Sequence, residues 1–254
     1  MVRVTASGDK VVAGSEKLIL RLGNQTSDHH MGGAIEFGKD GKLYIATGDN
    51  ETSSNSQELT NLFGKMLRIN KSGTIPTDSP FYTRASGNNR ATWALGLRNP
   101  FKFAIEPTMD TTATNTIFIN DVGEDAWEET DEGAAGANYG WNMYEGPEVS
   151  GPDLRLRSRR RPRNDGLLNH GGVFYPTIPQ FPSGYVGDYF FADFCSGWIG
   201  SFDPSTGEAS DFASGIVRPV DLEVSKNGEL YYLSRGNSST PGSVSKIRYS
   251  GGNP

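Results

Sequence analysis

The segment SDHHMGGAIEFGKDGKLYIATGDN, residues 27–50, contains the pattern on which the fold prediction rests. Two apolar runs flank the turn-forming segment Lys39–Gly41, so the stretch is predicted to form a β-hairpin. Polar residues cluster at both of its ends, in Asp28–His30 and in Gly48–Asn50. We expect these two ends to lie side by side only if other hairpins pack around this one.

An internal repeat carries the hairpin pattern along the chain. The segment Lys39–Ile45, KDGKLYI, recurs as Lys226–Tyr232, KNGELYY. Looser versions of its apolar run are found at Ile117–Asp121 and Tyr189–Asp193. Repeats of roughly 40–60 residues are typical of propeller blades, and about four to five such units fit in the chain. The sequence therefore predicts an all-β fold of the β-propeller type, with polar strand ends on a shared face.

Composition agrees with this fold and excludes several functions. The chain has 254 residues, with 32 Gly, 14 Pro and 11% aromatic residues, which suits many short strands joined by turns. A net charge of -6 argues against nucleic-acid binding, and six arginines within Leu154–Arg163 favour a solvated loop. The single cysteine, Cys195, excludes an intrachain disulfide, and no apolar run is long enough to span a bilayer.

Six motifs occur in the order in which a known family carries them. They are His30 with Gly33 and the following FGxDGxLY, NLxGKxLRIN at 61–70, WALGLRNP at 93–100, DVG at 121–123 with WEE at 127–129, GANYGW at 136–141, and FPxxY at 181–185 leading to YFFADF at 189–194. With these motifs the chain resembles the soluble aldose sugar dehydrogenases that use pyrroloquinoline quinone (PQQ), in the glucose/sorbosone dehydrogenase family.

This resemblance implies a six-bladed β-propeller, of which about four to five blades are present here. Residues 1–254 are then expected to form one propeller domain that is N-terminally incomplete relative to the family. An open ring exposes sheet edges, which favours association into oligomers. The resemblance also implies a secreted or periplasmic location, although residues 1–10 contain no apolar signal core.

The resemblance further implies an oxidoreductase that oxidises the anomeric carbon of an aldose to the lactone. Hydride passes to PQQ, Ca²⁺ holds the cofactor, and an external electron acceptor reoxidises it. By motif position His30 is the base, a role that suits histidine because its ring is largely neutral at pH 7. Arg98 and Asn99 match cofactor contacts, and a guanidinium can stabilise charge that develops on the quinone.

Further site residues follow from the same resemblance. They are cofactor contacts at Gln57 and Arg218, carbonyl ligands of the cofactor's calcium at Gly123 and Glu124, and a second, structural calcium site at Glu129 and Tyr139. Relatives carry a lysine and an arginine where this chain has Cys195 and Val220. Fewer cations predict weaker binding of a trianionic cofactor, since a charge-assisted hydrogen bond is worth roughly 1.5–3 kcal/mol.

Two other functions stay open from the sequence. One is a propeller that binds carbohydrate or protein without redox chemistry. The other is a metal-dependent lactonase-type propeller, which needs side-chain carboxylates at the channel. Its candidates are the strand-end residues Asp28, Asp49, Asp121 and Asp193.

Overall fold

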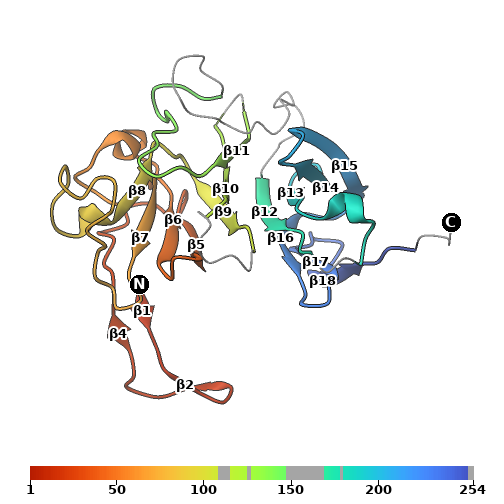
Figure 1. The fold of residues 1–254 in the computed structure, drawn as a ribbon, viewed down its shortest axis with the longest axis horizontal. Coiled ribbons are helices and arrows are strands. Elements are labelled where there is room, and N and C mark those ends of the chain that lie inside the picture. The colour runs from red at the N-terminus through yellow and green to blue at the C-terminus, as the bar shows by residue number, and fades with distance from the viewer. Residues whose placement is uncertain (108–114, 125–126, 147–168, 178–179, 251–254) are drawn as a thin grey trace.

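The computed structural model describes residues 1–107, 115–124, 127–146, 169–177 and 180–250 (Figure 1). Regular structure in these ranges consists of β-strands and short 3-10 turns. They contain no helix with the length and apolar character needed to cross a bilayer. The arginine-rich segment Leu154–Arg163 lies outside the described residues.

Four antiparallel sheets follow one another along the described chain (Figure 1). The first contains β5 (Gly32–Phe37), β6 (Leu43–Thr47), β7 (Lys65–Ile69) and β8 (Thr92–Leu95), and the second contains β9 (Pro100–Ile105), β10 (Ile117–Asp121) and β11 (Glu129–Glu132). The third contains β12 (Asn169–Phe174), β13 (Tyr189–Asp193), β14 (Trp198–Asp203) and β15 (Glu208–Ser214), and the fourth β16 (Pro219–Val224), β17 (Leu230–Ser234) and β18 (Ser243–Ile247). Consecutive strands pair within each sheet, which is the order of a propeller blade.

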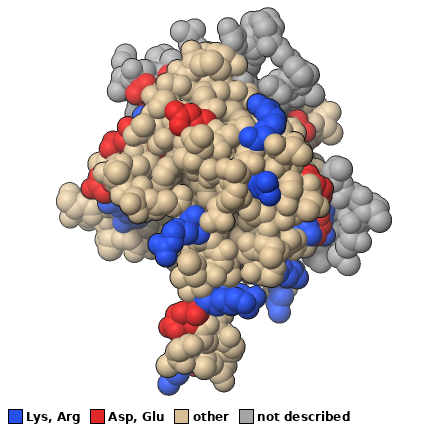
Figure 2. Space-filling view, turned by 90° about the vertical axis from the view of Figure 1, so that its left-hand side faces the viewer, with Lys and Arg blue, Asp and Glu red and all other residues tan. Residues whose placement is uncertain are grey.

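The N-terminal segment forms a ribbon that extends away from the sheets (Figure 1). In it β1 (Val2–Arg3) pairs with β4 (Lys17–Leu18), and β2 (Ala6–Ser7) pairs with β3 (Lys10–Val11). Three short 3-10 turns complete the elements used below: η1 (Ser53–Gln57), η2 (Gly87–Ala91) and η4 (Ser183–Tyr185). The surface seen in Figure 2 is mostly uncharged, with small scattered patches of basic and acidic side chains.

Apolar layers join each sheet to the next. Tyr44 and Met66 of the first sheet pack with Ile119 of the second in one buried cluster. Phe118 of the second sheet meets Tyr189 of the third edge-to-face, with ring centroids 4.9 Å apart. Each such buried aromatic pair adds roughly 0.5–1.5 kcal/mol beyond the burial of its area. The sheets are therefore held face to face, as blades are.

The first strands of the four sheets, β5, β9, β12 and β16, are neighbours in that order. A cavity of about 480 Å³ lies between them, and Glu36, Lys102, Asp221 and Glu223 place charges in its wall. A central channel occupies this position in a propeller. The sheets form an open arc, with β5 and β16 at its two ends (Figure 1). The chain thus has the fold of part of a β-propeller, as predicted.

The internal repeat marks the second strand of every sheet. Its four copies correspond to β6, β10, β13 and β17. The first three of these strands are buried along their whole length. Neighbouring sheets cover both faces of β10 and β13, whereas the outer face of β6 packs against the N-terminal segment and loop residues such as Leu20 and Leu62. One expectation about the opening hairpin is wrong. Gly32 pairs directly with Thr47, so antiparallel pairing alone places the two polar ends side by side.

Candidate functional site

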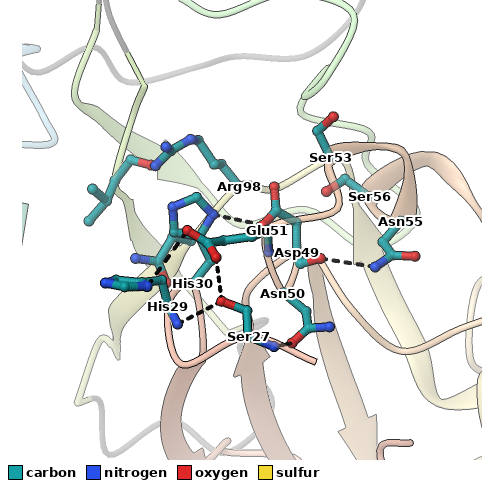
Figure 3. Close-up of polar contacts among 12 residues, drawn as sticks. Ser27, His29, His30, Asp49, Asn50, Glu51, Ser53, Asn55, Ser56 and Arg98 are labelled. Atoms are coloured by element: carbon teal, nitrogen blue, oxygen red, sulfur yellow. Dashed lines mark hydrogen bonds and ion pairs between the residues drawn. The ribbon is translucent and has the colours of Figure 1, made fainter. Parts of the chain in front are cut away.

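The two polar ends of the β5–β6 hairpin meet in a buried carboxylate (Figure 3). Oδ1 of Asp49 lies 2.8 Å from Nδ1 of His30. Its other oxygen, Oδ2, accepts a 2.8 Å hydrogen bond from Nε1 of Trp141. The Asp49 side chain is 2% exposed and that of His30 19% exposed. A carboxylate only accepts, so it favours the tautomer with the proton on Nδ1 and leaves Nε2 as the basic nitrogen.

Backbone contacts fix Asp49 from three sides. The Glu51 N–H donates to Oδ1 at 2.9 Å, and the Asp49 N–H donates to the Arg98 carbonyl at 2.8 Å. Nδ2 of Asn55 donates to the Asp49 carbonyl at 2.9 Å. Because the backbone of Asp49 is held independently of its side chain, the carboxylate presents a fixed surface to His30.

The backbone around this pair adopts an unfavourable conformation. His30, Asn50 and Glu51 have φ angles of 51°, 61° and 55°. Residues other than glycine rarely adopt this left-handed backbone conformation, and those that do are concentrated at functional sites. Oδ1 of Asn50 holds the turn by accepting from the Thr26 and Ser27 N–H groups at 3.1 and 3.2 Å.

The neighbouring histidine has a different environment. His29 is 69% exposed and its Nδ1 lies 2.9 Å from Asp28, whose side chain is 94% exposed. Glu51 lies 3.7 Å from the same nitrogen. In Figure 3 His29 points toward Glu51, whereas His30 points toward Asp49. The structure thus distinguishes the two adjacent histidines.

Arg98 adjoins the His30–Asp49 pair through Trp141. Its guanidinium carbon lies 5.5 Å from the centroid of the Trp141 ring, and Nη1 donates to the Val122 carbonyl at 3.2 Å. Nε of Arg98 is buried and has no hydrogen-bond partner among the described residues. A buried donor without a partner is unfavourable by about 1–3 kcal/mol. This nitrogen can therefore donate to a ligand oxygen with a net gain.

Asp121, at the end of β10, orders the backbone on either side of Arg98. Its two oxygens accept from the Arg98 and Asn99 N–H groups at 2.9 and 2.6 Å. Oδ1 of Asn99 in turn accepts from the Gly32 N–H at 3.2 Å. The strand ends of the first and second sheets are thereby joined into one face.

Gln57, the last residue of η1, closes the network on the side of Trp141. Its amide nitrogen donates to Oδ1 of Asn138 at 3.0 Å and to the Trp141 carbonyl. Nδ2 of Asn138 returns a 2.7 Å hydrogen bond to Oε1 of Gln57. Gln57 is thus placed beside Trp141, with its amide engaged by protein groups.

Gly123 and Glu124 lie just after β10, separated from it by Val122, whose carbonyl group accepts from Arg98. The Gly123 N–H donates to Glu128 at 3.3 Å, and the Glu124 N–H donates to Glu145 at 2.6 Å. With both N–H groups directed at carboxylates, the segment is rich in oxygen ligands of the kind that calcium takes.

Three carboxylates meet where β10 pairs with β11. One oxygen each of Asp121, Glu129 and Asp131 lie within 4.8 Å of one another. Burial raises the pKa of Asp121 to about 8, the charge of Glu129 adds to the rise, and the Arg98 N–H opposes it. Tyr139 donates its hydroxyl to the Glu132 carbonyl at 2.8 Å. The structure therefore brings Glu129 together with two aspartates, and the Tyr139 hydroxyl bonds elsewhere.

Arg218 lies across the strand-end face, before β16. Its guanidinium carbon is 5.6 Å from the centroid of the Phe194 ring. Burial, Asp193 and Glu128 raise the pKa of the Cys195 thiol, and Arg218 opposes the rise, so these groups from the second, third and fourth sheets share one surface. Arg218 thus stands on the side of the third and fourth sheets, and His30 on the side of the first.

The chain matches the family model described as Glucose / Sorbosone dehydrogenase over residues 1–186. The chain belongs to the glucose/sorbosone dehydrogenase family. It is 31% identical to the HIPL2 protein of Arabidopsis thaliana over 243 residues, which are 81% of this chain and 34% of that protein. It is 34% identical to aldose sugar dehydrogenase YliI of Escherichia coli strain K12 over 118 residues, 46% of this chain and 30% of that protein.

A solved structure confirms the fold. The PQQ-bound form of aldose sugar dehydrogenase from Streptomyces coelicolor superposes with a TM-score of 0.73 at 20% identity, covering 97% of this chain and 71% of the other. The chain spans about a third of the length of the two curated relatives that it matches.

Two residues that complete the site, Asp49 and Trp141, are not predicted from the sequence as residues of a dehydrogenase site. The sequence indicates Asp49 only as a candidate for a lactonase-type metal site, and Trp141 only as the end of a motif without a function. The signal for Asp49 is its place at the end of the second strand, opposite His30. Nothing local in the sequence indicates that Trp141 reaches Asp49, 92 positions earlier.

The four strand-end aspartates do not gather into one carboxylate cluster. Asp28 is paired with His29, and Asp49 with His30. Asp193 accepts from the Ser196 N–H at 2.7 Å within its own turn. Among the described residues, the acidic group that forms is that of Asp121 with Glu129 and Asp131.

Proposed function

We propose that this chain carries the quinone site of a sugar dehydrogenase, which oxidises the anomeric carbon of an aldose to the lactone and passes electrons to an external acceptor. The observation that carries the proposal is the pairing of His30 with buried Asp49. Trp141 joins this pair to Arg98, which has a buried donor without a partner among the described residues. Family membership supports it. We extend the proposal to residues 1–254 as one propeller domain.

His30 is the proposed base. Asp49 holds the ring with the proton on Nδ1, so Nε2 can take the proton of the anomeric hydroxyl. The adjacent carboxylate stabilises the imidazolium that forms. The Glu51 N–H and the Trp141 indole N–H also donate to this carboxylate and hold it in place. Proton transfer by such a positioned side chain contributes roughly 10²–10⁴-fold to a rate.

The residues around Arg98 fit PQQ by their chemistry. The quinone supplies the acceptor for the hydride when it is bound. Arg98 offers a permanent charge and a buried donor that lacks a protein partner among the described residues, both suited to a quinone oxygen. Asn99 and Gln57 border the same place, and Arg218 provides a second cation from the fourth sheet. Cys195 and Val220 add no positive charge.

The oxygen ligands near Arg98 fit calcium. We propose that the carbonyl groups of Gly123 and Glu124 hold the cofactor's ion. We propose a second ion at Glu129, with Asp121 and Asp131 as further ligands, because the oxygens of these three side chains lie within 4.8 Å of one another and calcium takes such oxygen ligands. Tyr139 can take part only through its carbonyl group if its hydroxyl stays on Glu132.

A turnover assay tests the proposal. The protein is incubated with PQQ and CaCl₂, and D-glucose and other aldoses are added with an artificial electron acceptor. We expect saturable acceptor reduction that falls at least about 100-fold in His30→Ala. His29→Ala, which removes the exposed neighbour, is the matched control and retains the rate. No turnover by the parent protein would overturn the proposed activity, and equal rates in the two variants would overturn the role of His30.

A further inference from the structure

Lys65 is the charged lysine of the NLxGKxLRIN motif at residues 61–70, and it has no role in the site described above. It begins β7, pairs with Thr47 on one side and Leu95 on the other, and is 0% exposed. Its ammonium donates to the carbonyl groups of Asn55, Ser56 and Phe63 at 2.7, 3.1 and 2.6 Å. All three ammonium donors are therefore used on backbone oxygens.

Two of these carbonyl groups belong to η1, the turn that borders the site. Side chains of the same turn point to the site: Asn55 donates to the Asp49 carbonyl at 2.9 Å, and Gln57 donates to the Trp141 carbonyl. Ser56 connects η1 to the segment before Arg98. Its carbonyl accepts from the Gly96 N–H at 2.9 Å, and its hydroxyl donates to the Leu97 carbonyl at 2.6 Å.

We propose that Lys65 is a positioning residue: its ammonium holds η1 in the conformation that directs Asn55 and Gln57 to Asp49 and Trp141, so that loss of its proton loosens the site. A neutral amine has two N–H donors for three buried carbonyl groups. One of the three carbonyl groups then loses its hydrogen bond from Lys65, which weakens the attachment of η1 to β7. The catalytic consequence rests on the proposed function, whereas the mechanical one does not.

The electrostatic setting makes this proton labile. Burial lowers the pKa of Lys65 to about 7, and the charge of Glu58, at the end of η1, partly opposes the shift. Glu58 is exposed, and the paired positions on β6 and β8 are Thr47 and Leu95, which carry no charge. The ammonium is therefore charged at pH 6 and mostly neutral at pH 9.

Amide hydrogen exchange tests the mechanical part without cofactor or turnover. The reporters are the N–H groups of Asn55, Glu58 and Gly96, which bond to the Thr52, Asn55 and Ser56 carbonyl groups. After correction for intrinsic exchange, we expect their protection in the wild type to fall roughly tenfold or more between pH 6 and pH 9, because one charge-assisted hydrogen bond no longer forms. The ladder between β6 and β7 should keep its protection.

Lys65→Met keeps the aliphatic length and removes the ammonium. It should show low protection of the three reporters at both pH values, whereas Lys71→Met, at an exposed lysine just after the same strand, should behave as the wild type. Protection of the reporters that is independent of pH in the wild type, or unchanged in Lys65→Met, would overturn the proposal. If Lys65→Met does not fold, the wild-type comparison decides alone.

A pH–rate profile separates this proposal from the proposed function. If the chain oxidises aldoses, kcat/KM of the wild type should decline on the alkaline side, and Lys65→Met should be slower throughout and lack that decline. An alkaline limb that persists in Lys65→Met would contradict the coupling to the site. Absence of turnover would overturn the dehydrogenase proposal and leave the exchange result to decide on Lys65.

Discussion

Replacing Asp49 by asparagine exchanges one oxygen of a buried carboxylate for an NH₂ group. The carboxylate accepts from His30 and Glu51 at one oxygen and from Trp141 at the other. If the amide oxygen keeps His30 and Glu51, the NH₂ group faces the indole N–H of Trp141 at a hydrogen-bond distance. Two donors then oppose each other in a site that is 2% exposed, and the opposite orientation creates two such conflicts.

The magnitude follows from these hydrogen bonds. One charge-assisted hydrogen bond is removed, worth roughly 1.5–3 kcal/mol, and a buried donor is left unpaired at roughly 1–3 kcal/mol. We expect Asp49→Asn to lower the free energy of unfolding by about 3 kcal/mol or more. For a chain of this size that corresponds to a fall in Tm of roughly 6–12 °C. Asp28→Asn is the matched control, because the Asp28 side chain is 94% exposed and also faces a histidine.

Urea denaturation followed by tryptophan fluorescence, with calorimetric Tm values, measures both variants. The control should stay within about 0.5 kcal/mol of the wild type. A double-mutant cycle with Trp141→Phe sharpens the test, because removal of the indole N–H removes the conflict with the new NH₂ group. Asp49→Asn should therefore be less destabilising in the Trp141→Phe background. Equal stability of Asp49→Asn and Asp28→Asn, or simple additivity in the cycle, would refute the assignment of these hydrogen bonds.

Three further predictions concern the channel, a turn and the carboxylate cluster. Burial and the charge of Glu223 raise the pKa of Glu36 to about 7. The free energy of unfolding should therefore fall by roughly 1–2 kcal/mol, after allowance for solvent screening, as pH rises from about 4.5 through 7. Glu36→Gln should abolish that fall in unfolding titrations at pH 5 and 8. Parallel pH profiles would contradict this. Gly64 and Gly41 have similar φ angles of +66° and +69°, but an added Cβ would lie 2.2 Å from Oγ of Ser56 at Gly64 and would contact nothing at Gly41. Gly41→Ala should therefore lower the free energy of unfolding by about 1 kcal/mol, and Gly64→Ala by about 2–4 kcal/mol. Equal effects of the two substitutions would disprove the close packing at Gly64. Glu129→Gln should raise Tm without calcium, because it relieves repulsion, and should reduce the stabilisation on adding CaCl₂. In the wild type that stabilisation amounts to about 2.7 kcal/mol of unfolding free energy at 100-fold excess over Kd. An unchanged calcium response would exclude Glu129 as a ligand.

The parts of the fold that the sequence predicted are those buried on both faces. β6, β10 and β13 are apolar because both faces of each strand are buried, so their repeat is visible. Edge strands leave no such pattern. β15, EASDFAS, is mostly exposed, and β11, ETDE, is acidic, so neither has the alternation that identifies a strand. Both form because a central strand offers them a row of backbone partners.

Some residues of the candidate site could also be predicted from the sequence, and others could not. His30 and Arg98 could be named because their motifs are local, and the structure connects them through Asp49 and Trp141. Trp141 could not be assigned, since its hydrogen bond with Asp49 depends on how the second sheet docks on the first. Lys65 has the sequence context of an ordinary strand residue. Its role depends on three carbonyl groups that only the folded turn brings to it.

In the proposed reaction, a quinone held beside His30 oxidises an aldose. Single-turnover reduction tests it most directly, because no external acceptor is involved. The chain is loaded with PQQ and CaCl₂, freed of excess cofactor and mixed with D-glucose while the absorbance of the cofactor is recorded. We predict reduction at a rate that saturates with sugar in the wild type and in His29→Ala, and that is at least about 100-fold slower in His30→Ala. A cofactor that binds to the wild type and stays oxidised in the presence of aldoses would contradict the proposed reaction.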